Sequence, residues 1–192
     1  MANKNDFSTT FLKVGMKLPN AEKLVNYLID KNTTMNGTVL LAMLGSKQMY
    51  EILIKKCSTN AKIVIADSKL VTFYFRNKKN ISCVNIKEND VDDFYNKLKN
   101  MPKFDYIIQN PPYSGSLHLD FLKKGYEILN NKGQMIIIEP AMWLINVRKY
   151  GKRNVEMRSQ SSAIKKYDEL KKMLEGQVKK IIIENYNWKW KL

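Results

Sequence analysis

Hydrophobic residues in this chain occur in two patterns, short continuous runs and stripes with apolar positions three or four residues apart. The continuous runs predict buried strands, and the stripes predict amphipathic helices. The expected strands are residues 38–44, 62–66, 81–86, 106–109, 135–138 and 178–183. The expected helices are residues 21–31, 47–56 and 117–129, and one after Ser159 that ends at Gly176. Helices and strands therefore alternate along most of the chain.

Continuous apolar strands separated by helices are typical of a mostly parallel sheet covered by helices on both faces. Right-handed crossovers would wind such strands into a Rossmann-like α/β fold. Ligands of these folds bind beyond the carboxyl ends of the strands, near the point where the strand order reverses. Polar or turn-forming residues follow the expected strand ends: Gly45, Asp67, Asn110, Glu139 and Pro140. We therefore expect a functional site at this rim.

The length of 192 residues suits a single domain over residues 1–192. No apolar run approaches the about 20 residues that cross a bilayer, and residues 1–10 lack the apolar core of a signal peptide. We therefore expect a cytoplasmic protein without membrane association. Cys57 and Cys83 stand alone, without the spacing of a zinc site, so free thiols and no metal site are expected.

The net charge of +15 points to a polyanionic partner, because lysine and arginine near phosphates release condensed counterions. The excess is concentrated in a basic C-terminal segment, residues 146–192, with 13 Lys or Arg against 5 Asp or Glu. This segment would complete or extend the domain. Its expected nucleic-acid-binding residues are Arg148, Lys149, Lys152 and Arg153. The alternative is a lysine-rich surface whose surplus charge only keeps the protein solvated.

Residues 110–113 read Asn-Pro-Pro-Tyr and follow the strand-like run at 104–109. Two consecutive prolines fix φ and lack N–H groups, so the loop after the strand is stiff. The side-chain oxygen of Asn110 and the carbonyl of Pro111 can accept hydrogen bonds from one amino group, and the ring of Tyr113 can stack on a flat base. Held in this way, the lone pair of an aromatic amine would be directed at an electrophile.

Residues 104–113 resemble the FDxIxxNPPY motif of S-adenosylmethionine-dependent amino-methyltransferases, above all the DNA adenine-N6 methyltransferases of restriction-modification systems and phages. The resemblance covers about residues 19–143, in the motif order of the γ group. It implies a methyltransferase fold, S-adenosylmethionine as cofactor, and Asn110, Pro111, Pro112 and Tyr113 as catalytic residues. His118, the only histidine, is expected to be a packing residue rather than a general base.

The same resemblance implies a set of cofactor-binding residues: Gly45, Ser46, Asp67, Asp93 and Phe94. Asp67 would accept hydrogen bonds from the ribose hydroxyls; it could also cap a helix, and both roles could hold together. Asp93 and Phe94 resemble the pair that holds the cofactor's adenine, or they could instead belong to the acidic start of a helix. The glycine-rich turn departs from the family, because Leu41 and Ala42 replace its acid and proline and Lys47 replaces its last glycine.

The family's target-recognition domain has no counterpart long enough in this chain. A bare catalytic domain would flip a base out of a duplex poorly, so we expect either a single-stranded substrate or a second copy or separate subunit that supplies the missing surface. Three functions are open: a DNA adenine-N6 methyltransferase, an RNA or protein-glutamine methyltransferase, and a decayed methyltransferase-like subunit that binds nucleic acid or a partner. The catalytic motif favours the first.

Overall fold

The computed structural model describes residues 21–23, 25–26, 29–30, 32–138 and 157–178. The chain divides into two compact units, residues 1–139 and 140–192, which are described separately. The expectation of one domain over residues 1–192 stays a prediction. No helix within the described part has the length and apolar character of a membrane span.

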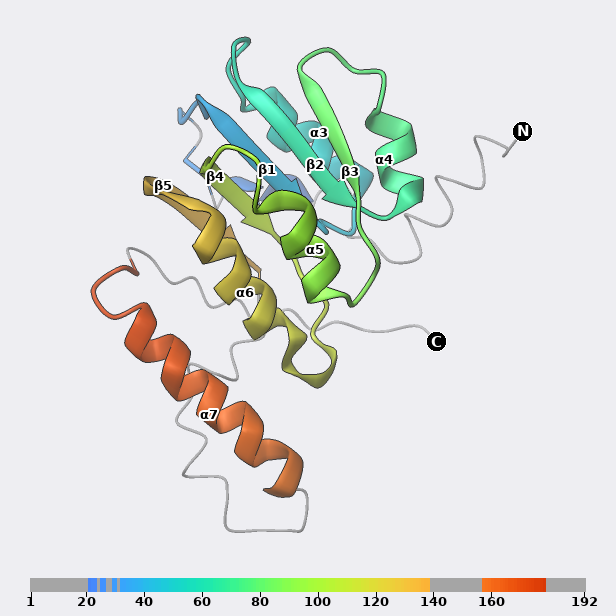
Figure 1. The fold of residues 1–192 in the computed structure, drawn as a ribbon. Helices are drawn as coiled ribbons and strands as arrows, with labels where there is room; N and C mark the ends of the chain where they lie inside the picture. The colour runs from blue at the N-terminus through green and yellow to red at the C-terminus, as the bar shows by residue number, and fades with distance from the viewer. Residues whose placement is uncertain (1–20, 24, 27–28, 31, 139–156, 179–192) are drawn as a thin grey trace. The chain divides into compact units, whose positions relative to one another are not determined.

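The first unit is an α/β structure around five strands (Figure 1). The strands are β1 (Thr38–Ala42), β2 (Lys62–Asp67), β3 (Ile81–Asn85), β4 (Phe104–Gln109) and β5 (Leu129–Ile137). The helices between them are α3 (Lys47–Lys55), α4 (Lys69–Phe75), α5 (Val91–Leu98) and α6 (Leu117–Ile128). All four neighbouring strand pairs are parallel. The expected Rossmann-like architecture is therefore confirmed.

The sheet has the strand order β3-β2-β1-β4-β5. The chain moves outward from β1 through β2 to β3, then crosses back to β4 on the other side of β1. The strand order therefore reverses between β1 and β4, and a ligand-binding crevice is expected beyond their carboxyl ends. The loops that meet there are residues 43–46 and 110–116.

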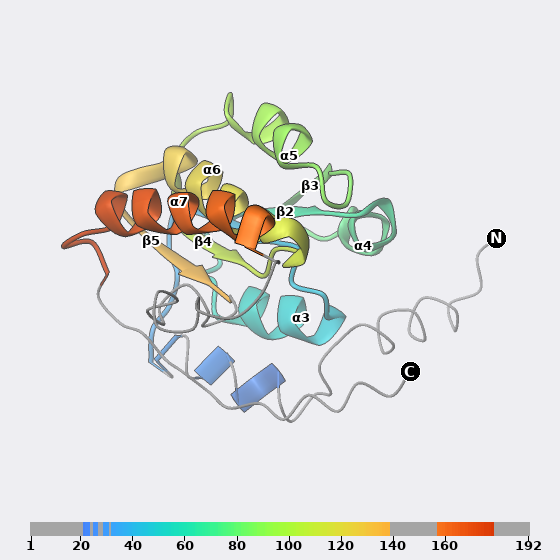
Figure 2. The same cartoon turned by 90° about the horizontal axis from the view of Figure 1, so that it is seen from below.

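Each face of the sheet is covered by its own helices, as Figure 2 shows from below. On one face α3 and α4 pack through Met49, Tyr50, Leu53, Val71 and Phe75. On the other, α5 and α6 pack through Phe94, Leu98, Phe121 and Ile128. The three central strands β2, β1 and β4 are largely buried, which explains their continuous apolar runs.

Three elements differ from the hydrophobic pattern, and one of them, α5, is expected only as the acidic helix start at Asp93. The pattern does not predict α4, because Val71, Thr72 and three aromatic residues give it a strand-like composition; tertiary packing of Val71 and Phe75 overrides that preference. β5 begins at Leu129 rather than at Met135. Leu129 pairs with Phe104 and Gln134 with Tyr106, so the polar residues between them form an irregularity inside the strand.

The second unit contains the helix α7 (Met157–Met173), which confirms the expected helix after Ser159. Gly176 has φ of +72°, a left-handed conformation that glycine adopts without strain, and it lies just past the end of that helix as predicted. The expected strand at 178–183 lies almost wholly outside the described residues. Of the expected helix at 21–31, residues 21–23 and 25–26 are helical, residues 29–30 are not, and the other four lie outside the described residues.

Candidate functional site

The loops after β1 and β4 lie side by side at the point where the strand order reverses. The backbone N–H of Asn110 donates to the carbonyl of Ala42 at 3.2 Å, which continues the pairing of β4 with β1 beyond the strand end. Gly45 has φ of +66°, and a Cβ atom built on it would lie 3.7 Å from Nδ2 of Asn110. The glycine turn and the Asn-Pro-Pro-Tyr corner therefore face each other at close range.

Residues with left-handed backbone occur in both of these loops. Met43 has φ of +53° and Ser116 has φ of +61°, whereas the other two such non-glycine residues in the described part are asparagines, which tolerate this region. A left-handed methionine is costly and persists only where its surroundings fix it. The backbone around the β1–β4 crevice is thus held in a specific shape.

Within the Asn-Pro-Pro-Tyr corner, the side chain of Tyr113 is hydrogen-bonded to that of Asn110. The hydroxyl of Tyr113 donates to Oδ1 of Asn110 at 2.5 Å and lies 3.4 Å from the carbonyl oxygen of Ile138, just after β5. Tyr113 remains 44% exposed, so part of its ring is open to a ligand. A carbonyl-type oxygen has two lone pairs, so Asn110 retains acceptor capacity.

His118 lies beneath this corner. Its ring meets that of Tyr113 edge-on, with centroids 6.0 Å apart, and the side chain is only 4% exposed. An edge-to-face contact of this kind holds an aromatic ring in position. The expectation that His118 is a packing residue is confirmed.

Asp67 at the end of β2 is tied to the glycine turn through Tyr50 of α3. The buried hydroxyl of Tyr50 donates to Oδ2 of Asp67 and accepts the backbone N–H of Leu44 at 3.2 Å. The other carboxylate oxygen accepts the N–H of Ser68 at 2.7 Å. The N-cap of α4 is Ser68, so the helix-cap interpretation of Asp67 is wrong. Its carboxylate oxygens keep lone pairs for further donors.

We expect Tyr50→Phe to lower the free energy of unfolding by about 1–3 kcal/mol, because it leaves the Leu44 N–H and one Asp67 oxygen without this partner. Urea unfolding measures the change. Tyr95→Phe is the matched control, since it also removes one hydroxyl but outside this network. Equal stability of the two variants would show that Tyr50 contributes only its ring.

Burial raises the pKa of Asp67 above its ordinary 3.8, and the hydrogen bonds from Tyr50 and Ser68 only partly offset this. A carboxyl whose pKa is higher in the folded state contributes most stability below pH 3.8 and loses that contribution as the pH rises through the folded pKa. We therefore expect wild type to lose stability relative to Asp67→Asn as the pH rises from 3.8 toward neutrality. Thermal unfolding of both proteins across this range tests it, and parallel curves would contradict it.

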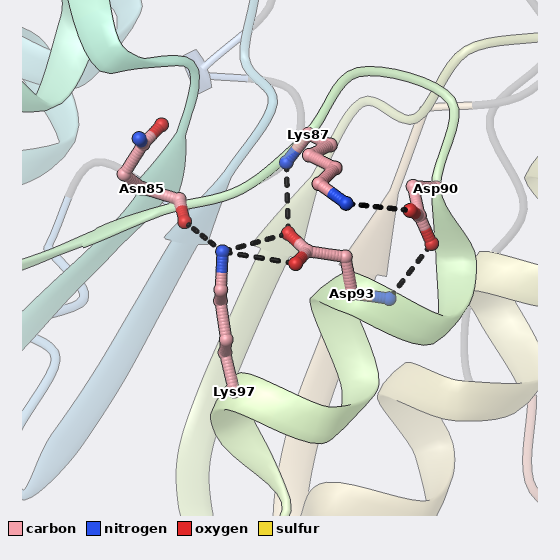
Figure 3. Close-up of polar contacts among 5 residues, drawn as sticks. All are labelled: Asn85, Lys87, Asp90, Asp93 and Lys97. Atoms are coloured by element: carbon pink, nitrogen blue, oxygen red, sulfur yellow. Dashed lines mark hydrogen bonds and ion pairs between the residues drawn. The ribbon is translucent and has the colours of Figure 1, made fainter.

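Asp93 belongs to the start of α5, as the helix interpretation predicts. Asp90 is the N-cap and accepts the N–H of Asp93 at 2.8 Å. The Asp93 carboxylate accepts the N–H of Lys87 and pairs with Lys97, each at 2.9 Å (Figure 3). These partners lower the pKa of Asp93, the Lys87 N–H most. The carboxylate therefore fastens the β3–α5 loop to its helix.

Phe94 is fully buried and packs edge-on against Phe121, with ring centroids 5.3 Å apart. In this position its ring offers no face to a ligand. Cofactor contact by Asp93 and Phe94 stays a prediction, which their geometry does not favour.

Asn85 is a site residue that the sequence pattern does not single out. It ends β3 directly beside Asp67, its register partner at the end of β2. Its backbone oxygen accepts Lys97 Nζ at 2.7 Å, while Figure 3 shows its side-chain amide directed away from that lysine. The amide is thus exposed next to Asp67 at the same rim. The register that places Asn85 beside Asp67 marks it as a site residue, and the sequence alone does not give this register.

The remaining residues of the glycine turn are mostly buried. Ser46 is 4% exposed, so contact with a ligand would fall mainly to its backbone, and Leu41 and Ala42 are fully buried in the sheet. Lys47 pairs with Glu51 at 3.7 Å and lies over the ring of Tyr74. Arg148, Lys149, Lys152 and Arg153 lie outside the described residues, so nucleic-acid binding by them stays a prediction.

No protein-family model matches the sequence, and no curated protein does. Among solved structures, TrmN from Thermus thermophilus is 17% identical, with 70% of this chain and 43% of that chain covered and a TM-score of 0.48. A Streptococcus mutans protein described as a SAM-dependent methyltransferase is 19% identical, with 76% and 38% covered and a TM-score of 0.48. This chain thus spans less than half the length of either protein.

A third similar structure is the nucleotide-binding subdomain of the enoylreductase domain of PpsC from Mycobacterium tuberculosis. It is 11% identical, with 86% of this chain and 99% of that chain covered and a TM-score of 0.50. Identities this low support a shared fold only. The Rossmann-like fold is common to methyltransferases and nucleotide-binding domains, so the function must be argued from the site.

Proposed function

We propose that this protein transfers a methyl group from S-adenosylmethionine to the N6 amino group of adenine in DNA. The observation that carries the proposal is the Asn-Pro-Pro-Tyr corner, which lies at the carboxyl end of β4 and faces the turn at Gly45. Pro111 is buried and Tyr113 is partly exposed, so the corner is anchored on one side and open on the other.

The rim of the sheet fits the proposed cofactor in three places. Gly45 has no side chain, so its backbone can lie close to a ligand. Its φ of +66° would strain most other residues. Asp67 offers a carboxylate at a strand end, suited to a pair of ribose hydroxyls. The exposed amide of Asn85, beside Asp67, can both donate to and accept from the edge of an adenine ring.

S-adenosylmethionine, when bound, supplies a methyl group on a positively charged sulfur. The task of this chain is to prepare the amine that takes it up. Asn110 Oδ1 and the carbonyl oxygen of Pro111 would accept the two N–H groups, which directs the nitrogen lone pair out of the base plane. Tyr113 would stack on the base, releasing or sharing its hydrogen bond with Asn110 as it does so.

DNA is the proposed substrate for two reasons. The net charge of +15 favours a polyanionic partner, and the Asn-Pro-Pro-Tyr motif resembles that of the DNA adenine-N6 methyltransferases. RNA is the nearest alternative, and protein glutamine is less well matched to this charge. A second copy or another subunit would supply the surface that recognises the target, or the substrate would be single-stranded. The cytoplasm is the expected compartment.

A second candidate function is a nucleic-acid-binding subunit that no longer uses the cofactor. The observation that favours it is the glycine turn, where fully buried Leu41 and Ala42 stand in place of the family's acid and proline. Such a turn would lack one acceptor for the methionine part of the cofactor.

Calorimetric titration with S-adenosylmethionine and with its demethylated product separates the two candidates. The proposed function predicts measurable heat with both ligands. An absence of heat and of any thermal shift at millimolar ligand would favour the cofactor-free subunit. Where binding is observed, transfer of a labelled methyl group to DNA, RNA or protein identifies the substrate class.

A further inference from the structure

The outer surface of α4 and the turn after it combine exposed apolar side chains with positive charge. Phe73 is 56% exposed and Leu70 39%, and they lie one helical turn apart. Residues 69–80 include four basic side chains and no acidic one: Lys69, Arg76, Lys78 and Lys79. All four are exposed. Figure 1 shows α4 next to β3, the edge strand of the sheet.

Basic groups lie against each of the three consecutive aromatic rings in α4. The Arg76 guanidinium lies 3.9 Å from the centroid of the Phe73 ring, and Lys47 Nζ lies 4.1 Å from that of Tyr74. Lys78 Nζ is 4.9 Å from the Phe75 ring. These distances are those of cation–π contacts. Arg76 and Lys78 thus place positive charge beside aromatic rings of α4, and Lys47 of α3 does the same.

Phe73 is not needed for the core of the first unit. Phe75 is fully buried between the sheet and α3, whereas Phe73 points outward with Leu70. A single exposed aromatic residue is ordinary. An exposed ring beside a guanidinium, in a segment with four basic residues and no acidic one, is an arrangement that can stack a base and attract its phosphate.

We propose that the outer surface of α4, formed by Leu70, Phe73, Arg76, Lys78 and Lys79, binds single-stranded nucleic acid. The ring of Phe73 and the plane of Arg76 would stack with a base, and Lys78 and Lys79 would contact phosphates. A single strand fits better than a duplex, because only unstacked bases expose a face to an aromatic side chain. The charge is complementary to this occupant.

The position of α4 links this surface to the candidate site. The helix begins at Lys69, two residues after Asp67, so the surface starts at the rim where β2 ends. A strand bound along α4 would run from this rim toward the turn at residues 76–80, which lies at the amino ends of β2 and β3. The inference extends the proposed function but does not rest on it, because the binding needs no cofactor.

Fluorescence anisotropy with a labelled oligothymidylate tests the inference. The oligonucleotide should be longer than the about 4–16 nucleotides that a single-strand-binding domain typically covers. Phe73→Leu keeps an apolar side chain but removes the ring, and we expect about tenfold weaker binding.

Lys78→Gln with Lys79→Gln should weaken binding and reduce the slope of log affinity against log salt by about 1.4. The charge-matched control is Lys123→Gln with Lys132→Gln, exposed lysines of α6 and β5 at the other side of the sheet.

The control pair should bind like wild type, and light scattering should give every variant the wild-type mass. The inference is overturned if Phe73→Leu and the Lys78/Lys79 variant bind like the control pair, or if duplex binds as tightly as single strand and depends on Phe73 equally. A change of mass in Phe73→Leu would also overturn it, since the surface would then join copies of the chain. Calorimetry should show unchanged binding of S-adenosylmethionine to Phe73→Leu, which separates failure here from failure of the proposed function.

Discussion

Replacing Asn110 with alanine should lower the rate of methyl transfer about a hundred- to a thousandfold. The change removes the side-chain oxygen that would accept a hydrogen bond from the target amine, and fixed polar groups of this kind contribute about that much to a chemical step. It also removes Asn110 Oδ1 as the acceptor of the Tyr113 hydroxyl. Transfer of a radiolabelled methyl group under single-turnover conditions measures the effect.

Two controls accompany this variant. Asn96→Ala removes an exposed asparagine from α5, away from the crevice, and should transfer at the wild-type rate. Asn110→Asp keeps an acceptor oxygen and should retain more activity than Asn110→Ala. Full transfer by Asn110→Ala, with cofactor binding intact, would refute the role assigned to this corner.

The second large effect is expected at Asp67. Asp67→Asn should weaken binding of S-adenosylmethionine about ten- to a hundredfold, because hydrogen bonds to a charged acceptor contribute about 1.5–3 kcal/mol. The side-chain oxygen of the new asparagine can still accept a hydrogen bond from the Tyr50 hydroxyl, so the structure around α3 should be unchanged. Calorimetric titration gives the dissociation constant.

Asp93→Asn is the matched control, because it neutralises a second acid that sequence resemblance also assigns to the cofactor. In the structure that carboxylate is already held by the Lys87 N–H and by Lys97. We expect near wild-type affinity and slightly lower stability. If Asp93→Asn instead lost affinity and Asp67→Asn did not, the cofactor would be held by the β3–α5 loop, and the assignment of Asp67 would be wrong.

The general architecture can be predicted from the chain because its central strands are buried on both faces and leave continuous apolar runs. The positions of Gly45, Asp67 and Asn110 at strand ends follow from those runs, and parallel strands bring such ends to one rim.

The rest depends on contacts between distant residues. Nothing in the local pattern indicates that Tyr50 connects Leu44 to Asp67. The pair of Asp93 with Lys97, in contrast, has the (i, i+4) spacing of a helix ion pair and is local. Phe94 matches a family motif by letter but is buried against Phe121. Asn85 becomes visible as a candidate only once the register places it beside Asp67.

The most direct test of the account is to identify the methylated nucleoside. The protein would be incubated with isotope-labelled S-adenosylmethionine and single-stranded or duplex DNA, and the DNA digested and analysed by mass spectrometry. We expect the label in N6-methyl-2′-deoxyadenosine. The amount of this labelled nucleoside should be high with the wild-type protein and strongly reduced with Asn110→Ala. Label on another base, equal label with both proteins, or no label despite bound cofactor would contradict it.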